Sequence, residues 1–175
     1  MTSPTTVHTP SGAHESTLRR YVDGPALLEN TLSELQLTDL DKPPADGGWT
    51  IRQIVHHIVD GDDIWKTCIK IALGNDQAEF TLSWYWSRTQ EDWAERWAYS
   101  SRSLEESLAL LKAIRNHVCQ LLTMRPDGWT RSAVVRDSKG TLERVTVGFV
   151  VEMQADHLMH HVNRILDIHK QGGGT

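Results

Sequence analysis

Apolar residues recur every three or four positions in four long segments of the chain, which is the spacing of amphipathic helices. Pro25 lies inside the first segment and is expected to kink or divide that helix. The third segment is expected to break near Ser100 and Ser101. The four predicted helices run from about His14 to Leu37, Thr50 to Leu73, Arg88 to Met124 and Val147 to Lys170.

The second predicted helix has the clearest start signal in the chain. Thr50 suits the N-cap position and Gln53 follows three residues later, so the two can form a capping box. Trp49, just before the cap, can pack against Ile54 as a hydrophobic staple. Gly74 and the asparagine after it predict where this helix ends.

The stretch from Trp129 to Val147 alternates between apolar and polar side chains around a turn at residues 138–140, which predicts a β-hairpin. Residues 76–87 are expected to be a loop, and its many aromatic side chains suggest that it folds back over another part of the chain. The strand–helix–strand alternation of a doubly wound sheet is absent. The predicted fold class is therefore all-α, a four-helix bundle with a small β-hairpin insertion before the last helix.

Composition divides the chain into one domain and two tails. Residues 1–12 are rich in threonine, serine and proline and are predicted to be a disordered tail. Residues 13–170 are predicted to form the bundle domain, and residues 171–175 a flexible C-terminal tail. A chain of 175 residues is long enough to bury a real core.

The net charge and the number of cysteines limit the possible binding partners of the protein and its cellular compartment. A formal net charge of −5 argues against a nucleic-acid partner, because such proteins usually present a basic face. No apolar stretch approaches the length of a membrane span, and the first residues do not resemble a secretory signal, so no membrane association is expected. Cys68 and Cys119 give neither a disulfide framework nor a CxxC motif, which favours a cytoplasmic location.

Nine histidines and seven tryptophans are many for this length, and the histidines carry the candidate chemistry. His157 and His161 are four residues apart in the last predicted helix, so both imidazoles project from one face. Two neutral imidazoles held in this way form half of a tetrahedral transition-metal site. His57, in the second predicted helix, is the candidate third ligand.

Both candidate regions contain a doublet of histidines, and helical phase chooses between the members. His57, His157 and His161 fall on the flank of their helix's apolar stripe, where a bundle helix can line a cavity. His56 falls near the solvent side of its helix and His160 points almost directly away from the stripe. The alternative is that these are partly buried polar residues, since HxxxH pairs also arise by chance in histidine-rich chains.

Several polar residues could support such a site. Asp60 and Gln154 lie about one turn from a ligand histidine and could fix an imidazole by a hydrogen bond, although residues in such positions are more often ordinary solvent-facing polar residues. His117 and His169 are further ligand candidates, of which His169 lies closer to the apolar stripe than to the ligand face. The remaining candidates, for binding an anionic group or for walling the cavity, are Arg52, Arg164, Trp49, Trp65, Trp84 and Trp86.

Two short motifs resemble those of the DinB/YfiT-like superfamily. The run from Gly48 to Asp60, GWTIRQIVHHIVD, resembles its first motif, a tryptophan at a helix start followed eight residues later by a histidine. The run from His157 to Ile165, HLMHHVNRI, resembles its second motif, an HxxxH pair on the last helix. The resemblance follows the order of elements from about His14 to His169, and the YfiT-like branch is the most similar.

The resemblance implies a four-helix bundle, often dimeric, with Zn²⁺ or Ni²⁺ on three histidines that face an open cavity. In this chain the matching ligands are His57, His157 and His161, the three that helical phase also selects. Members of known activity are often thiol S-transferases that act with low-molecular-weight thiols such as bacillithiol or mycothiol, or related isomerases. Others are described only as hydrolases. A small-molecule substrate and a homodimer are therefore expected.

Three functions follow from these expectations. The first is a metal-dependent S-transferase that moves a low-molecular-weight thiol onto an electrophile. The second is a metal-dependent hydrolase of a small substrate. The third is a non-catalytic module that binds a metal or a small ligand, which a closed shell of four protein ligands would favour.

Overall fold

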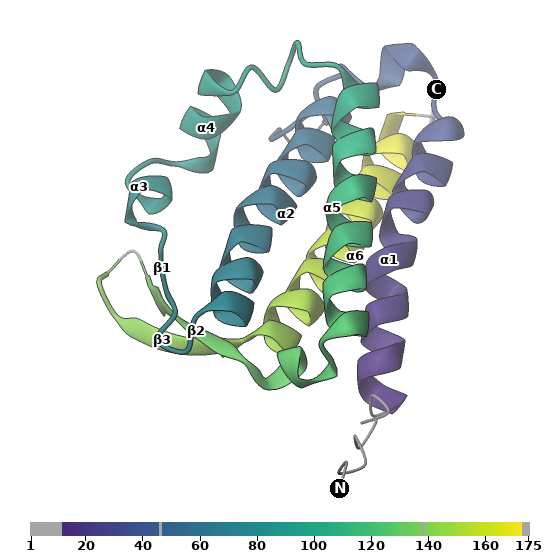
Figure 1. The fold of residues 1–175 in the computed structure, drawn as a ribbon. Helices are drawn as coiled ribbons and strands as arrows, with labels where there is room; N and C mark the ends of the chain where they lie inside the picture. The colour runs from purple at the N-terminus through teal and green to yellow at the C-terminus, as the bar shows by residue number, and fades with distance from the viewer. Residues whose placement is uncertain (1–11, 46, 138, 173–175) are drawn as a thin grey trace, which may run out of the picture.

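The computed structural model describes residues 12–45, 47–137 and 139–172. Four long helices lie side by side as a bundle, in which α1 and α2 each pack against α5 and α6 (Figure 1). The predicted fold class is confirmed. Most residues of the two predicted tails lie outside the described residues, but Gly12, Gln171 and Gly172 are helical. The four helices are α1 (Gly12–Ser33), α2 (Ile51–Gly74), α5 (Leu104–Met124) and α6 (Val147–Gly172).

The helix α1 continues through Pro25 without being divided, although it ends earlier than predicted, before the 3₁₀ turn η1 (Leu37–Asp39). Proline has no N–H, so the carbonyl of Tyr21, four residues earlier, loses its helical donor. Arg115 of α5 replaces that donor, because its Nη1 donates to the Tyr21 carbonyl at 2.9 Å. Glycine at position 24 leaves the space that this guanidinium occupies, since a Cβ there would lie 2.4 Å from Arg115 Nη1.

A small sheet lies beside the C-terminal end of α2 and the start of α6 (Figure 1). Strands β2 (Ser132–Arg136) and β3 (Leu142–Thr146) pair antiparallel, which confirms the predicted hairpin, although the residues around Trp129 form the 3₁₀ turn η2 (Pro126–Thr130) instead of strand. Strand β1 (Glu79–Thr81) pairs parallel with β2 and corrects the predicted loop. Its partner lies far along the chain, so local pattern does not mark this strand.

Two short helices, α3 (Ser83–Trp86) and α4 (Gln90–Arg96), connect the sheet to α5 and stand beside α2 (Figure 1). The expected break in the third helical segment is confirmed but is wider, covering residues 97–103. Tyr85 stacks on Trp93 and Trp93 on Trp97, with ring centroids 5.7 and 4.6 Å apart. The aromatic side chains of this segment therefore pack largely on one another.

The apolar core consists of two clusters with a buried ion pair between them. One cluster, around Val151, lies toward the sheet, and the other, around Leu158, lies toward the opposite end of the bundle. Arg115 and Asp62 pair between these clusters, and both side chains are fully buried. Two charges are removed from water at a large cost, so this pair must be well hydrogen-bonded to persist.

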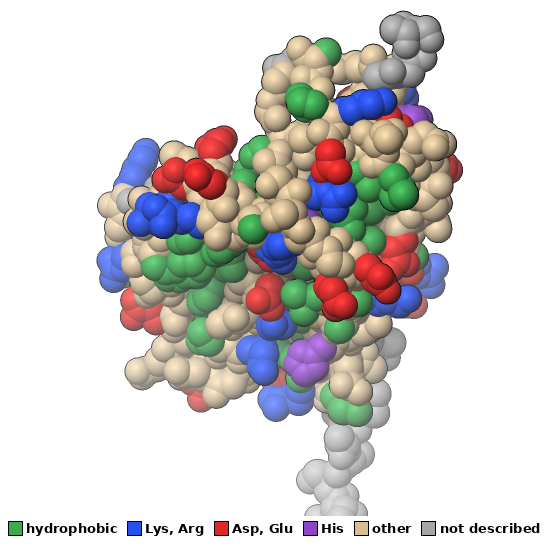
Figure 2. All heavy atoms as spheres, turned by 90° about the horizontal axis from the view of Figure 1, so that it is seen from above, with side chains coloured by type: hydrophobic (Ala, Val, Ile, Leu, Met, Phe, Trp, Pro, Cys, Tyr) green, Lys and Arg blue, Asp and Glu red, His purple; other side chains and the backbone are tan. Residues whose placement is uncertain are grey.

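The surface carries charges of both signs. On the face shown in Figure 2, acidic and basic side chains are interspersed and no area of one sign dominates. The exposed pair Arg20–Asp156 joins α1 to α6 at 2.6 Å. Among the described helices, none is both long enough and apolar enough to cross a membrane.

Candidate metal centre

The start and the apolar face of α2 fix the position of His57. Gln53 N donates to Thr50 Oγ1 at 3.3 Å and Thr50 N donates to Gln53 Oε1 at 2.9 Å, so the predicted capping box is present. Ile51 and Ile54 begin the buried face of the helix. His57 lies on the flank of that face and is half-buried.

The imidazole of His57 meets those of His157 and His161 from α6. Nε2 of His157 lies 3.1 Å from Nε2 of His57 and 3.1 Å from Nε2 of His161. Tetrahedral nitrogen ligands at about 2.0–2.1 Å from an ion lie about 3.3 Å from one another, so the observed spacing fits a shared ion. The ligand atoms of the three histidines all lie within 4.8 Å of one another. In the described part of the chain, this is the only group of three or more histidine, cysteine or carboxylate side chains placed so that it could hold a metal ion.

The surroundings keep all three imidazoles neutral at pH 7. Burial and, to a smaller extent, the neighbouring His161 lower the pKa of His57 to about 4. Burial and the nearby His57 lower the pKa of His157 to about 4, while burial and His157 lower that of His161 to about 3. Neutral imidazole is the form that binds a metal, so the site is ready to act as a ligand set at neutral pH.

His57 and His161 form part of the wall of an open pocket of about 390 Å³. Trp49 lies against His57 with the ring centroids 4.8 Å apart, so Trp49 lines this cavity. The group holds three protein ligands and opens toward the pocket, where an exogenous ligand can approach. The other residues that line the pocket are Gly48, Ile54, Gln90, Glu91, His160 and Arg164.

Neither of the two candidate orienting residues forms a hydrogen bond to a ligand imidazole. Asp60 accepts two hydrogen bonds from Arg102, at 2.7 and 3.1 Å. Gln154 is buried, not solvent-facing, and its Nε2 donates to the carbonyl of Gly61 at 2.9 Å. Two of the three clustered imidazoles have a buried Nδ1 with no hydrogen-bond partner among the described residues.

The neighbouring histidines stay out of the cluster, for different reasons. His160 is exposed, as its helical phase predicts. His56 is fully buried, so its predicted position near solvent is wrong. Its Nδ1 lies 2.9 Å from Ser107 Oγ of α5 and its ring lies 5.8 Å from that of Tyr99. The phase of α2 alone could not show that α5 and the segment before it cover this flank.

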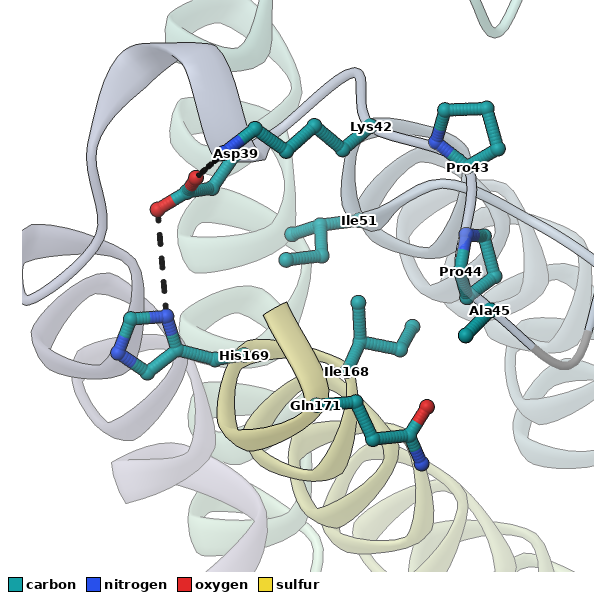
Figure 3. A pocket seen from close by; sticks show the side chains of 9 residues that line it. All are labelled: Asp39, Lys42, Pro43, Pro44, Ala45, Ile51, Ile168, His169 and Gln171. Atoms are coloured by element: carbon teal, nitrogen blue, oxygen red, sulfur yellow. Dashed lines mark hydrogen bonds and ion pairs between the residues drawn. The ribbon is translucent and has the colours of Figure 1, made fainter. Parts of the chain in front are cut away.

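The other two ligand candidates, His117 and His169, also lie outside the three-histidine group. His169 borders a separate cavity of about 200 Å³, near the start of α2 and the end of α6 (Figure 3). Asp39 lies there between two basic groups, with its carboxylate 2.6 Å from Lys42 Nζ and 4.0 Å from His169 Nδ1 (Figure 3). His169 therefore lies beside the surface ion pair of Lys42 and Asp39 and apart from the histidine cluster.

The two arginine candidates differ in their surroundings. Arg52 donates to both carboxylate oxygens of Asp41, from Nε at 2.6 Å and Nη2 at 3.0 Å, so its charge is already matched. Arg164 lines the histidine pocket together with Gln90 and Glu91 of α4. No sequence motif marks the two α4 residues, because tertiary packing brings that short helix beside the pocket.

Of the four tryptophans considered as cavity walls, two line open pockets and two pack in the core. Trp49 lines the histidine pocket, and Trp84 lines a second opening of about 450 Å³ beside α2. Trp65 packs against Phe80 with ring centroids 5.8 Å apart, and Trp86 packs partly buried against the same core cluster. Two of the four therefore face open space.

Comparison with known proteins supports the resemblance. Residues 20–165 match the family model described as the DinB superfamily. The "Putative metal-dependent hydrolase OB0782" of Oceanobacillus iheyensis is 29% identical over 150 residues, covering 85% of this chain and 81% of that protein. The "Putative metal-dependent hydrolase YfiT" of Bacillus subtilis is 27% identical over 150 residues, covering 85% and 80%.

A solved structure shares the fold. It carries the description "YfiT from Bacillus subtilis is a probable metal-dependent hydrolase with an unusual four-helix bundle topology", and it aligns with a TM-score of 0.79 at 23% identity, covering 99% of this chain and 95% of that one. At this identity the likeness concerns the fold alone. The family match spans most of the chain and includes all three clustered histidines. This protein belongs to the DinB superfamily.

Proposed function

We propose that this protein is a metal-dependent enzyme whose divalent cation is held by His57, His157 and His161. The observation that carries the proposal is the convergence of three neutral Nε2 atoms, 3.1 Å apart in successive pairs, at the wall of an open pocket. A bound ion, with Zn²⁺ or Ni²⁺ the expected choices, would acidify a water or thiol ligand and so supply a nucleophile at neutral pH.

The surrounding residues would serve this chemistry in separate ways. Burial keeps the imidazoles unprotonated, and Trp49 shields one side of His57 from solvent. Glu91 is the carboxylate that lines the same pocket, where it can accept a proton from an incoming nucleophile. Asp60 lines a different opening and is bonded to Arg102, so it is not a candidate for this role.

Hydrolysis of a small substrate is the reading that the relatives favour, because those named above are described as metal-dependent hydrolases. Transfer of a low-molecular-weight thiol is the second candidate. A thiol bound to the metal would lose its proton outright, so this reading needs no base in the pocket. A non-catalytic binding module is the third reading, and an open side on the ligand group weighs against it.

A paired assay separates the three readings. The purified protein is loaded with Zn²⁺ or Ni²⁺ and assayed for cleavage of small esters and amides, and for consumption of a small thiol with an electrophile. Activity that disappears in His157→Ala and persists in His117→Ala supports the proposed enzyme, because His117 is exposed and lies outside both the cluster and the pocket lining. A loaded protein inactive in both assays, over broad substrate panels, would instead support the binding module.

A further inference from the structure

We propose that Gln154 is a positioning residue for the metal centre. Its side-chain amide, bonded to the backbone of α2, sets the spacing of α2 and α6 at which the three imidazoles converge. The inference rests on the metal-dependent function proposed above. It assigns to Gln154 a role through the helix backbone and not through contact with an imidazole.

The hydrogen bond lies about one helical turn from the histidines on both helices. Gln154 precedes His157 by three residues on α6, and Gly61 follows His57 by four residues on α2. The two helices run in opposite directions here, so the bond and the histidines lie at successive levels of one interface. Gln154 Nε2 donates to the Gly61 carbonyl at 2.9 Å, and the Gln154 side chain is buried.

The imidazole of His157 lies close to α2 at Gly61. A Cβ on Gly61 would lie 3.6 Å from Cε1 of His157, which means that the imidazole packs directly over the backbone of α2. The position of this ring therefore depends on the distance between the two helices. The bond from Gln154 to the Gly61 carbonyl holds that distance.

Both ends of this connection are anchored in the buried ion pair. Asp62, the next residue after Gly61, accepts from Arg115 at 2.5 and 3.2 Å. Arg115 Nη2 also donates to the backbone carbonyl of Gln154 at 2.9 Å. The guanidinium thus fixes the backbone of Gln154 while the Gln154 side chain fixes the backbone of Gly61.

The imidazoles of His157 and His161 depend on the helix spacing because they lack the hydrogen bond that usually orients a ligand histidine. A histidine that binds a metal commonly donates its other ring nitrogen to a carboxylate or carbonyl, which orients the ring. In His157 and His161, Nδ1 is buried and has no hydrogen-bond partner among the described residues. Ring orientation then falls to packing and helix spacing, which Gln154 controls on α6.

The test is Gln154→Met, which keeps the length of the side chain and removes the amide. Zn²⁺ affinity is measured by competition with a chromogenic chelator, and Co²⁺ loading is followed by its visible absorption. We expect a loss of about 10- to 100-fold in Zn²⁺ affinity and an altered Co²⁺ spectrum, as for other residues that orient metal ligands. Gln154→Asn, too short to reach Gly61, should show the same loss and serves if the first variant does not fold.

The control is Val118→Ala, a truncation in the core on α5, a helix that carries no ligand. It should lower the unfolding midpoint while keeping wild-type Zn²⁺ affinity and the wild-type Co²⁺ spectrum. The inference is overturned if Gln154→Met stays within two-fold of wild-type affinity, or if Val118→Ala loses as much. Failure of the wild type itself to bind either ion would instead overturn the proposed function.

Discussion

Removing the guanidinium of Arg115 should be the most damaging single change to this fold outside the apolar core. Its Nε and Nη2 bond to Asp62 of α2, its Nη1 to the Tyr21 carbonyl of α1, and its Nη2 also to the Gln154 carbonyl of α6. Because Arg115 itself belongs to α5, one side chain joins all four helices of the bundle.

The magnitude follows from burial. In Arg115→Met the carboxylate of Asp62, which is fully buried, loses its counter-charge, and breaking a buried pair in this way costs about 3–5 kcal/mol. That is a large part of the roughly 5–15 kcal/mol that holds a typical domain folded. Replacing both partners by apolar side chains, Arg115→Met with Asp62→Leu, should restore part of the loss, since no charge is then left unpaired while the Tyr21 carbonyl still lacks its donor.

The assay is urea unfolding followed by circular dichroism and tryptophan fluorescence for the wild type, both single variants and the double variant. We expect a coupling energy of at least about 2 kcal/mol between the two positions. The matched control is the exposed pair Arg20–Asp156, which also joins two helices but should contribute only about 0–1 kcal/mol. Additive single losses at the buried pair, or a buried loss no larger than that of the exposed pair, would refute this reasoning.

Three further predictions use the same unfolding assay. Gly61→Ala should stabilise the protein by about 0.5–1 kcal/mol, because the new Cβ would meet the ring of His157 at an ordinary contact distance. Gly24→Ala should instead destabilise the protein, because its Cβ would clash with the guanidinium of Arg115. Equal effects of the two substitutions would contradict this contrast. Ala98 adopts a left-handed φ of 53°, so Ala98→Gly should stabilise by about 1 kcal/mol, and a loss would show that the strain is absent. The stability of the metal-free protein should stay constant with pH above about pH 6.5 and should fall as the pH drops toward 4. The reason is that the histidines of the unfolded chain take up protons at a higher pH than those of the folded protein. A free energy of unfolding that does not change between these pH values would argue against the lowered pKa values.

Much of the fold could be predicted from local pattern, because the long helices carry their own signals. The capping box of Thr50 and Gln53 and the apolar stripe after it define α2 before any tertiary contact is known. Strand β1 could not be predicted in this way, because Phe80 becomes strand only by pairing with Val135. The same limit applies to α4, whose place beside the histidine pocket depends on packing.

The candidate site shows the same division. The phase of two helices was enough to choose His57, His157 and His161, which the structure brings together. Helical phase gave the wrong prediction for His56, which is buried and not near solvent. The sequence pattern of α2 does not show which neighbouring element covers that side of the helix.

The buried pair was missed although a signal exists in the sequence. Arg115 occupies the apolar stripe of α5, between Leu111 and Val118, and Asp62 lies four residues after Ile58 on the buried stripe of α2. Opposite charges that interrupt two facing stripes predict a buried ion pair. Pro25 becomes tolerable for the same reason, since the guanidinium serves the carbonyl that the proline leaves without a donor.

Metal content tests the central claim most directly. The wild type, His57→Ala, His157→Ala and His160→Ala are each loaded with Zn²⁺ or Ni²⁺, exchanged into metal-free buffer and analysed by elemental mass spectrometry. A three-histidine centre predicts about one ion per chain in the wild type and in His160→Ala, and a loss toward background in the other two. Equal metal content in the wild type and His57→Ala, or metal lost with the exposed His160, would contradict the assignment.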